Sequence, residues 1–216
     1  MKKTLLFACL LALSNFTLFA QTAKHPRELH TPEKSAIHVP PQEAPAGLTK
    51  IYSNLGKSKT DLFSDGAAWL VTGPNTGNGI QFMGMPFTPK ANSHVSQVQV
   101  AVEYVKGANQ VNLSIYGDSG GAPGTLLAGP VTVMNLPAAG TCCTLAVANF
   151  APVAVTAGTQ YWVVADTPLT GTGSDFVGGW GWIAKTVLQG ENDGSVWYGF
   201  PAYTQEVAGK VLGTIP

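Results

Sequence analysis

The feature that most restricts the fold of this chain is a series of short runs in which apolar and polar residues alternate. Residues 97–104 alternate in this way, and residues 111–115 repeat the pattern. A period of two is typical of a β-strand with one buried face. The runs are separated by turn-forming residues, since 25 glycines and 15 prolines make up about 19% of the chain, where ~12% is usual. An all-β protein with many turns is therefore predicted.

About ten short strands can be placed between residues 51 and 216. Residues 97–104 and 111–115 are predicted to form a hairpin around a turn at 106–109, and 117–124 a longer turn. Residues 161–165 are nearly continuously apolar, which is typical of a strand covered on both faces. Further strands are expected at residues 80–87, 126–134, 143–147, 176–183, 195–200 and 207–214. The predicted fold is a jelly-roll-like antiparallel β-sandwich.

The chain divides into three parts. In residues 1–20, Lys2 and Lys3 precede a short apolar run that ends near Ala20, which is the pattern of a signal peptide. Residues 21–48 contain five prolines among charged residues and no apolar periodicity, so we expect a disordered tether. Residues 49–216 are long enough for a single domain with one core.

Charge and hydropathy limit the partners of the protein. Only 11% of the residues are charged and the formal net charge is zero, whereas nucleic-acid binding requires clustered cations. No apolar segment of membrane-spanning length follows residue 20, and residues 209–216 carry no hydrophobic tail or sorting motif. We therefore expect a soluble exported product, periplasmic or extracellular, that does not bind nucleic acid.

Several motifs occur in an order that resembles a known family. They are the segments IYSNLG at 51–56, FTP at 87–89, the strand at 95–102, SIYGDSGGAPGTLL at 114–127 and VTAGTQYWVV at 155–164. Their order is similar to that in the choice-of-anchor R family of bacterial exported β-sandwich domains. The resemblance implies a secreted or surface-displayed sandwich, and it supplies no catalytic residues.

One segment, Gly-Asp-Ser-Gly-Gly at 117–121, is similar to the sequence around the nucleophile of chymotrypsin-like proteases. Such a serine requires a histidine base and an acid that orients it. The predicted domain contains one histidine, His94, and the interval from His94 to Ser119 spans little more than a strand pair. We therefore interpret the segment as a turn, and the chain as a non-enzyme.

Aromatic residues near the C-terminus are the candidate ligand-binding group. Trp180 and Trp182 share one face of a strand whose intervening positions are glycines, and Trp197 and Tyr198 follow after a polar loop. Exposed indoles of this kind could stack on sugar rings. Alternatively, Trp180 and Trp182 fill the space between two sheets, as expected for Trp162 in its apolar run.

Two smaller features leave alternatives open. Adjacent Cys142 and Cys143 could form a vicinal disulfide in an oxidising compartment, or they could be thiols on opposite faces of a strand. Asp118 and Asp193 lie in turns, where each could contribute to a structural calcium site or remain solvated. No other cofactor is expected.

These observations predict a secreted, non-catalytic β-sandwich binding module. Its ligand would be an extracellular carbohydrate, bound by Trp180, Trp182, Trp197 and Tyr198. The alternative is a structural or adhesive protein of the cell surface or extracellular matrix, whose ligand is another protein. Exposure of the tryptophans should discriminate between them.

Overall fold

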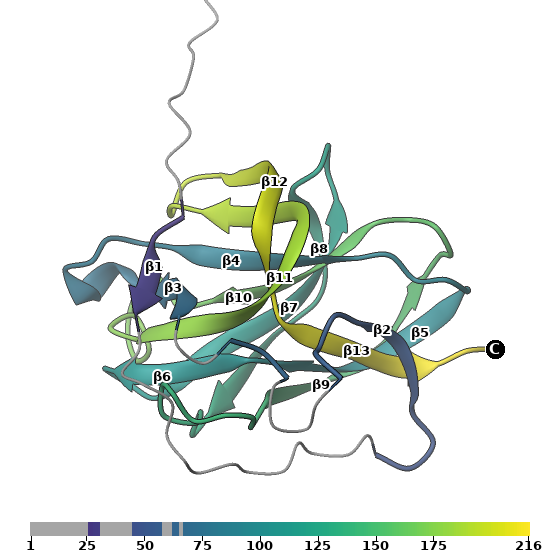
Figure 1. The fold of residues 1–216 in the computed structure, drawn as a ribbon, viewed down its shortest axis with the longest axis horizontal. Coiled ribbons are helices and arrows are strands. Elements are labelled where there is room, and N and C mark those ends of the chain that lie inside the picture. Colours follow the sequence, from purple (N-terminus) through teal and green to yellow (C-terminus); the bar gives the residue numbers. More distant parts are fainter. Residues whose placement is uncertain (1–25, 31–44, 58–61, 65–66) are drawn as a thin grey trace, which may run out of the picture.

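The computed structural model describes residues 26–30, 45–57, 62–64 and 67–216, so the expected signal peptide at 1–20 lies outside the described residues. The described residues form thirteen strands and one short 3-10 helix, so the structure is nearly all β, as the alternating runs predicted (Figure 1). In chain order the elements are β1 (Glu28–His30), β2 (Thr49–Ser53), β3 (Ala67–Thr72), η1 (Pro74–Thr76), β4 (Phe82–Phe87), β5 (Ser93–Val100), β6 (Val102–Lys106), β7 (Gln110–Asp118), β8 (Pro123–Met134), β9 (Ala146–Val155), β10 (Tyr161–Asp166), β11 (Val177–Asn192), β12 (Trp197–Val207) and β13 (Gly209–Thr214). None of the described segments is a helix that could cross a membrane.

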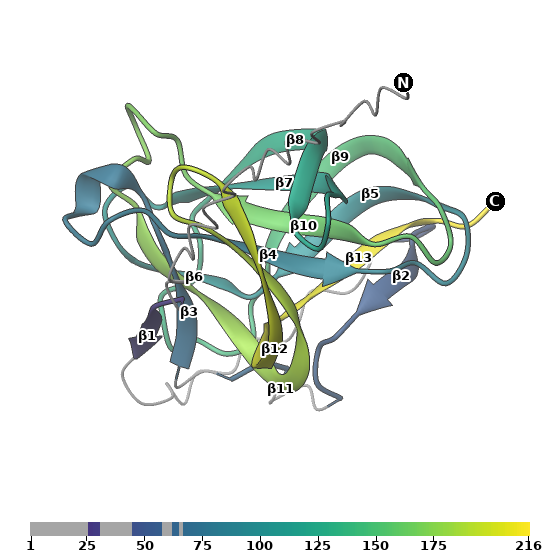
Figure 2. The ribbon, with the colours of Figure 1, turned by 90° about the horizontal axis from the view of Figure 1, so that it is seen from above.

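The strands form two antiparallel sheets that pack into a sandwich (Figure 2). The nine-stranded sheet has the order β1-β3-β11-β4-β10-β7-β8, with β6 and β12 also paired to β11, and the four-stranded sheet has the order β2-β13-β5-β9. The predicted fold class is therefore confirmed. Among the described residues there are more strands than the ten expected, and some are long: β8 has 12 residues and β11 has 16.

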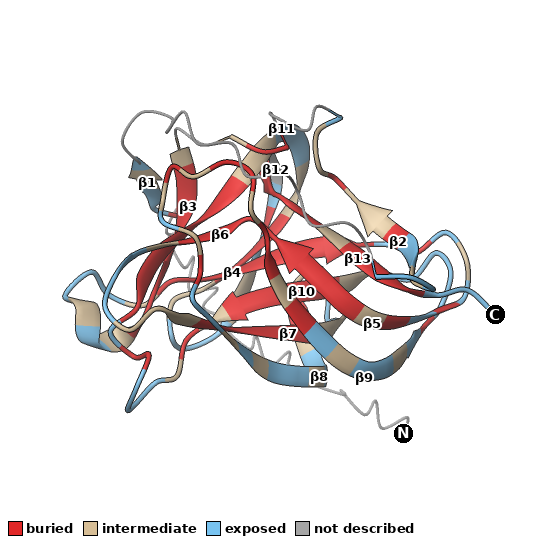
Figure 3. Cartoon of the chain, turned by 90° about the horizontal axis from the view of Figure 1, so that it is seen from below, coloured by how far each residue is buried: buried red, intermediate tan, exposed pale blue. Residues whose placement is uncertain are grey.

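The core lies between the two sheets and follows the alternation in the sequence (Figure 3). Val111, Leu113 and Ile115 on β7 are fully buried, as are Val98 and Val100 on β5. Burying a side chain of this size stabilises the fold by roughly 1.5–3 kcal/mol. Strand β10 is central in its sheet, between β4 and β7, and its residues 162–165 are fully buried. The prediction of a strand covered on both faces is confirmed.

Two single residues mark the places where the chain passes from one sheet to the other. Ala101 separates β5 from β6, and Ala208 separates β12 from β13. Their backbones and that of Gly181 on β11 close a ring of three hydrogen bonds: Ala101 donates to Ala208 (3.0 Å), Ala208 to Gly181 (2.8 Å) and Gly181 to Ala101 (2.9 Å). The two sheets are thus joined by main-chain bonds where the strands cross.

The predicted hairpin of residues 97–104 and 111–115 is wrong. β5 pairs with β9 and β13, β6 pairs with β11, and β7 pairs with β8 and β10. The alternation placed the valines of these strands in the core correctly, but Gln97, Gln99 and Glu103, on the face expected to be solvated, are buried as well. It also did not reveal that the chain changes sheets at Ala101. The hairpin in this region is β7–β8, and its turn lies within the predicted long turn at 117–124.

Part of the expected tether belongs to the folded domain. β1 pairs with β3 at the edge of the nine-stranded sheet. Just before it, Arg27 donates from its backbone N–H (2.9 Å) and its Nε (3.0 Å) to Oε1 of the buried Gln81. The same guanidinium donates to the carbonyl of Ile80 (2.9 Å). Residues 26–30 of the expected tether are therefore part of the folded domain, which the low apolar content of the segment did not indicate. Residues 21–25 and 31–44 of the tether lie outside the described residues.

Candidate binding pocket

A pocket of about 220 Å³ lies where the four-stranded sheet meets the nine-stranded sheet. β2 supplies its residue from the smaller sheet, and β4, β11, β12 and the loops beside β4 and β10 supply the others. The lining residues are Tyr52, Pro86, Phe87, Thr88, Gln160, Lys185, Val187, Leu188 and Glu206. Apolar and polar groups thus meet in one small site.

The polar part of the pocket is a hydrogen-bonded group of three side chains, those of Tyr52, Lys185 and Glu206. The hydroxyl of Tyr52 donates to Oε1 of Glu206 (2.7 Å), and Nζ of Lys185 lies 2.8 Å from Oε2. The Glu206 side chain is only 1% exposed, whereas that of Lys185 is 47% exposed. Nζ of Lys185 also lies 3.4 Å from the Tyr52 hydroxyl. Lysine is therefore the member of the group that reaches solvent.

The phenol of Tyr52 is held in its protonated form. Burial raises the pKa of Tyr52, and the negative charge and hydrogen bond of Glu206 raise it further. An ionised phenol could not donate to the carboxylate and would be repelled by it. Tyr52 is therefore a hydrogen-bond donor at neutral pH rather than a base.

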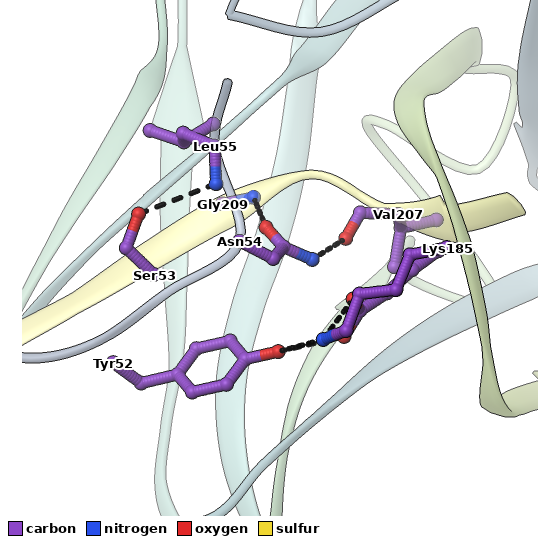
Figure 4. A network of polar contacts seen from close by, with 8 residues as sticks. Tyr52, Ser53, Asn54, Leu55, Lys185, Val207 and Gly209 are labelled. Carbon is purple, nitrogen blue, oxygen red and sulfur yellow. Dashed lines mark hydrogen bonds and ion pairs between the residues drawn. The ribbon is translucent and has the colours of Figure 1, made fainter. Parts of the chain in front are cut away.

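Asn54 fixes the backbone beside this group (Figure 4). Its Nδ2 donates to the carbonyl of Val207 (2.8 Å), and its Oδ1 accepts from the backbone N–H of Gly209 (2.8 Å). Asn54 lies two residues after Tyr52, and Val207 directly follows Glu206. One side chain therefore holds β2 against the junction of β12 and β13 and keeps Tyr52 and Glu206 in register.

Aromatic rings form the apolar wall behind the polar group. Phe87 is 1% exposed and stacks with Tyr161 at a centroid distance of 5.6 Å, while Tyr52 lies 6.2 Å from Phe87 in a tilted arrangement. Nζ of Lys185 is 5.8 Å from the centroid of the Tyr52 ring, within the range of a cation–π contact.

The sequence-predicted aromatic site is not assembled as expected. Trp180 is fully buried, and its indole N–H donates to the carbonyl of Ala208 (2.9 Å). Trp182 packs against the core and is half-buried. A Cβ added to Gly181, the glycine between them, would lie 2.6 Å from the Phe63 ring, so the opposite face of β11 is closely packed as well. The carbohydrate interpretation is wrong for Trp180, because an indole without accessible surface cannot stack on a ligand.

The other two predicted aromatics lie at the tip of the β11–β12 hairpin. Trp197 and Tyr198 are half-buried, and Trp197 contacts Tyr116 with a centroid distance of 6.4 Å. Tyr198 contacts Phe200 at 6.3 Å. Neither residue lines the pocket.

Asp118 and Asp193, the calcium candidates, each bind groups of the protein itself. Oδ1 of Asp118 accepts hydrogen bonds from Trp162 (2.8 Å) and Gln160 (2.6 Å), and Oδ2 accepts from Gly121. Desolvation alone would raise the pKa of Asp118, but these three bonds outweigh it and lower the pKa. Asp193 accepts from the backbone and hydroxyl of Ser195. In the described part of the chain, no three His, Cys, Asp or Glu side chains are grouped to hold a metal ion.

The remaining motifs have structural positions. Cys142 and Cys143 form a disulfide, the first of the two alternatives, and both residues are buried. Ser119 lies in the β7–β8 turn of one sheet, and its backbone N–H donates to Ala122, whereas His94 lies on β5 of the other sheet. The Gly-Asp-Ser-Gly-Gly segment is therefore a turn.

The sequence did not reveal the pocket, because its residues come from distant segments. Tyr52 and Glu206 are 154 positions apart. One signal was present: Glu206 directly precedes an apolar run from Val207, where a carboxylate is unusual.

Comparison with known proteins does not assign the chain. No family model and no curated protein matches it. The interpretation of the pocket depends on its own geometry.

Proposed function

We propose that this protein is an exported, non-catalytic binding module whose ligand is an extracellular carbohydrate held in the pocket between the two sheets. The observation that carries the proposal is the half-buried ring of Tyr52, supported from behind by Phe87, next to the ammonium of Lys185, which reaches solvent. Export is supported by the signal pattern in residues 1–20 and by the order of motifs that resembles the choice-of-anchor R family.

The pocket has the mixed chemistry that a sugar requires. A sugar ring presents an apolar C–H face and a rim of hydroxyls that both donate and accept hydrogen bonds. Tyr52, Val187 and Leu188 offer apolar surface, while Thr88 and Lys185 offer polar groups at the exposed side. Drug-sized ligands occupy roughly 300–1,000 Å³, so a pocket of about 220 Å³ fits a single sugar unit.

The arrangement of Glu206 supports binding rather than catalysis. One of its oxygens accepts from Tyr52 and the other is paired with Lys185. A general acid or base must reach the proton that it transfers, and this carboxylate is 1% exposed. Lys185 therefore meets the ligand, and Glu206 holds the lysine in place.

A glycan array followed by calorimetry with the selected monosaccharide tests the proposal. Lys185→Ala removes a charged hydrogen-bond donor that is worth about 1.5–3 kcal/mol, so the dissociation constant should rise at least about tenfold. Lys106→Ala is the matched control, since Lys106 is exposed on β6 and does not line the pocket. It should leave the affinity unchanged.

Two results would contradict the proposal. One is the absence of binding to every glycan on the array at millimolar concentration. The other is an equal loss of affinity in Lys185→Ala and Lys106→Ala, which would place the glycan outside this pocket.

A further inference from the structure

The two edge strands on one side of the sandwich come from a segment without charge. Residues 119–165 contain no Lys, Arg, Asp, Glu or His, although 12 basic and 12 acidic residues occur in the chain. This segment includes β8 and β9, which lie side by side with much of their surface exposed (Figure 3). The sandwich therefore has one long uncharged edge.

Each of these strands is paired on one side only within the described structure. β8 ends the nine-stranded sheet and pairs with β7, and β9 ends the four-stranded sheet and pairs with β5. The outer side of an edge strand presents backbone N–H and C=O groups that can pair with another strand.

Apolar side chains add to the exposed backbone. On β8, Leu126 is 43% exposed, Leu127 41% and Met134 62%. The side chains that turn toward the core are also incompletely covered: Val131 and Val133 on β8, and Phe150 and Val153 on β9, are only half-buried. The core is thus open to solvent along this edge.

The opposite edges of the same sheets are protected. β1, at the other end of the nine-stranded sheet, carries Glu28 and His30, and β2, at the other end of the four-stranded sheet, carries Lys50. Charged side chains on edge strands normally prevent association. β8 and β9 carry no charged side chain, although Pro130 on β8 and Pro152 on β9 also limit the backbone groups that can pair.

We propose that the β8–β9 edge is an interface through which two copies of this chain associate. A surface without charge offers nothing to attract a charged partner, and it causes no repulsion when it meets its own copy. Antiparallel edges are self-complementary under a two-fold axis, and such an interface closes at the dimer. The proposal does not depend on the sugar pocket, whose residues lie elsewhere.

Sedimentation velocity of the purified protein over a range of concentrations tests the inference. A concentration-dependent dimer is expected, and Met134→Lys should raise its dissociation constant at least about tenfold, because each copy would bring an unpaired charge into the interface. Val196→Lys is the matched control, since Val196 is 49% exposed at the tip of the β11–β12 hairpin. It should leave the dimer unchanged, as should Lys185→Ala.

Variants of opposite charge at one position test whether the interface joins two copies of this chain. A mixture of Leu126→Lys and Leu126→Glu proteins should form a heterodimer more tightly than either variant forms a homodimer. Amide exchange of the unmodified protein gives a measurement that needs no variant: β8 amides should become more protected as concentration rises. A protein that stays monomeric, β8 protection independent of concentration, or equal effects of Met134→Lys and Val196→Lys would overturn the proposal.

Discussion

Replacing Asn54 with alanine should destabilise the protein strongly, because one buried side chain satisfies two main-chain groups. Asn54 is 8% exposed, and both of its bonds, to the carbonyl of Val207 and from the N–H of Gly209, are 2.8 Å long. The backbone bond from Asn54 to the carbonyl of Gly209 (3.2 Å) would remain, so β2 should stay paired.

The magnitude follows from these contacts. A net hydrogen bond contributes about 1 kcal/mol, and a buried group left without a partner costs about 1–3 kcal/mol. Water that enters the space left by the amide would offset part of this. The expected loss in the free energy of unfolding is therefore about 2–4 kcal/mol, which for a chain of this size lowers Tm by about 5–15 °C.

Urea unfolding and calorimetry of Asn54→Ala measure this loss. Asn78→Ala is the matched control, since Asn78 is exposed in the turn after η1, and it should change stability by less than about 0.5 kcal/mol. Because the junction also positions Glu206, Asn54→Ala should weaken ligand binding in the pocket. A loss of less than about 1 kcal/mol, or one equal to that of the control, would refute the reasoning.

Three further predictions concern groups outside the pocket. Burial raises the pKa of Asp166 to about 6 despite a hydrogen bond with Asn112, so its contribution to stability is present below pH ~4 and lost as pH rises through about 6. Between pH 4.5 and pH 7 the unmodified protein should lose on the order of 1–3 kcal/mol of unfolding free energy from this group, measured with urea. Asp166→Asn should not show this loss, and a variant with the same pH dependence as the unmodified protein would contradict the prediction. Asp118→Ala should destabilise the protein by about 1–3 kcal/mol in urea, because the indole N–H of Trp162 loses a charged acceptor, and wild-type stability would be the contrary result. Alkylation of unfolded protein, followed by mass spectrometry, should modify Cys142 and Cys143 only after prior reduction; modification without reduction would show free thiols.

The fold class could be predicted because it depends on local patterns. The apolar run at 161–165 specifies a strand covered on both faces, as observed. The alternation at 111–115 correctly places Val111, Leu113 and Ile115 in the core, although Asn112 and Ser114 on the other face are buried as well. The pairing of the strands could not be predicted in the same way. The break at Ala101 is a single residue inside a continuous alternating run, so periodicity alone indicated one strand and a hairpin where the chain changes sheets.

The candidate site was less accessible to sequence reasoning than the fold. Trp180 and Trp182 suggested an exposed platform, but Trp180 is fully buried and bonded to Ala208 where the two sheets cross, a contact that no local pattern indicates. Glu206 and Tyr52 could not be connected, since no sequence pattern links two side chains from opposite ends of the domain. β8 was predicted as a strand, but the strand expected at 143–147 was wrong in its bounds, since β9 runs from Ala146 to Val155. The position of both strands at the margin of the sheets required the topology.

The backbone ring of Ala101, Gly181 and Ala208 has a consequence for how the domain responds to force and to ligands. Because the crossing strands are bonded to each other and to β11, the two layers are fastened to each other at this point. If a ligand enters the pocket, which both layers line, we expect it to be accommodated by rotation of side chains such as Lys185. When force is applied through a bound ligand, we therefore expect the domain to respond as one rigid body rather than by separation of its two sheets.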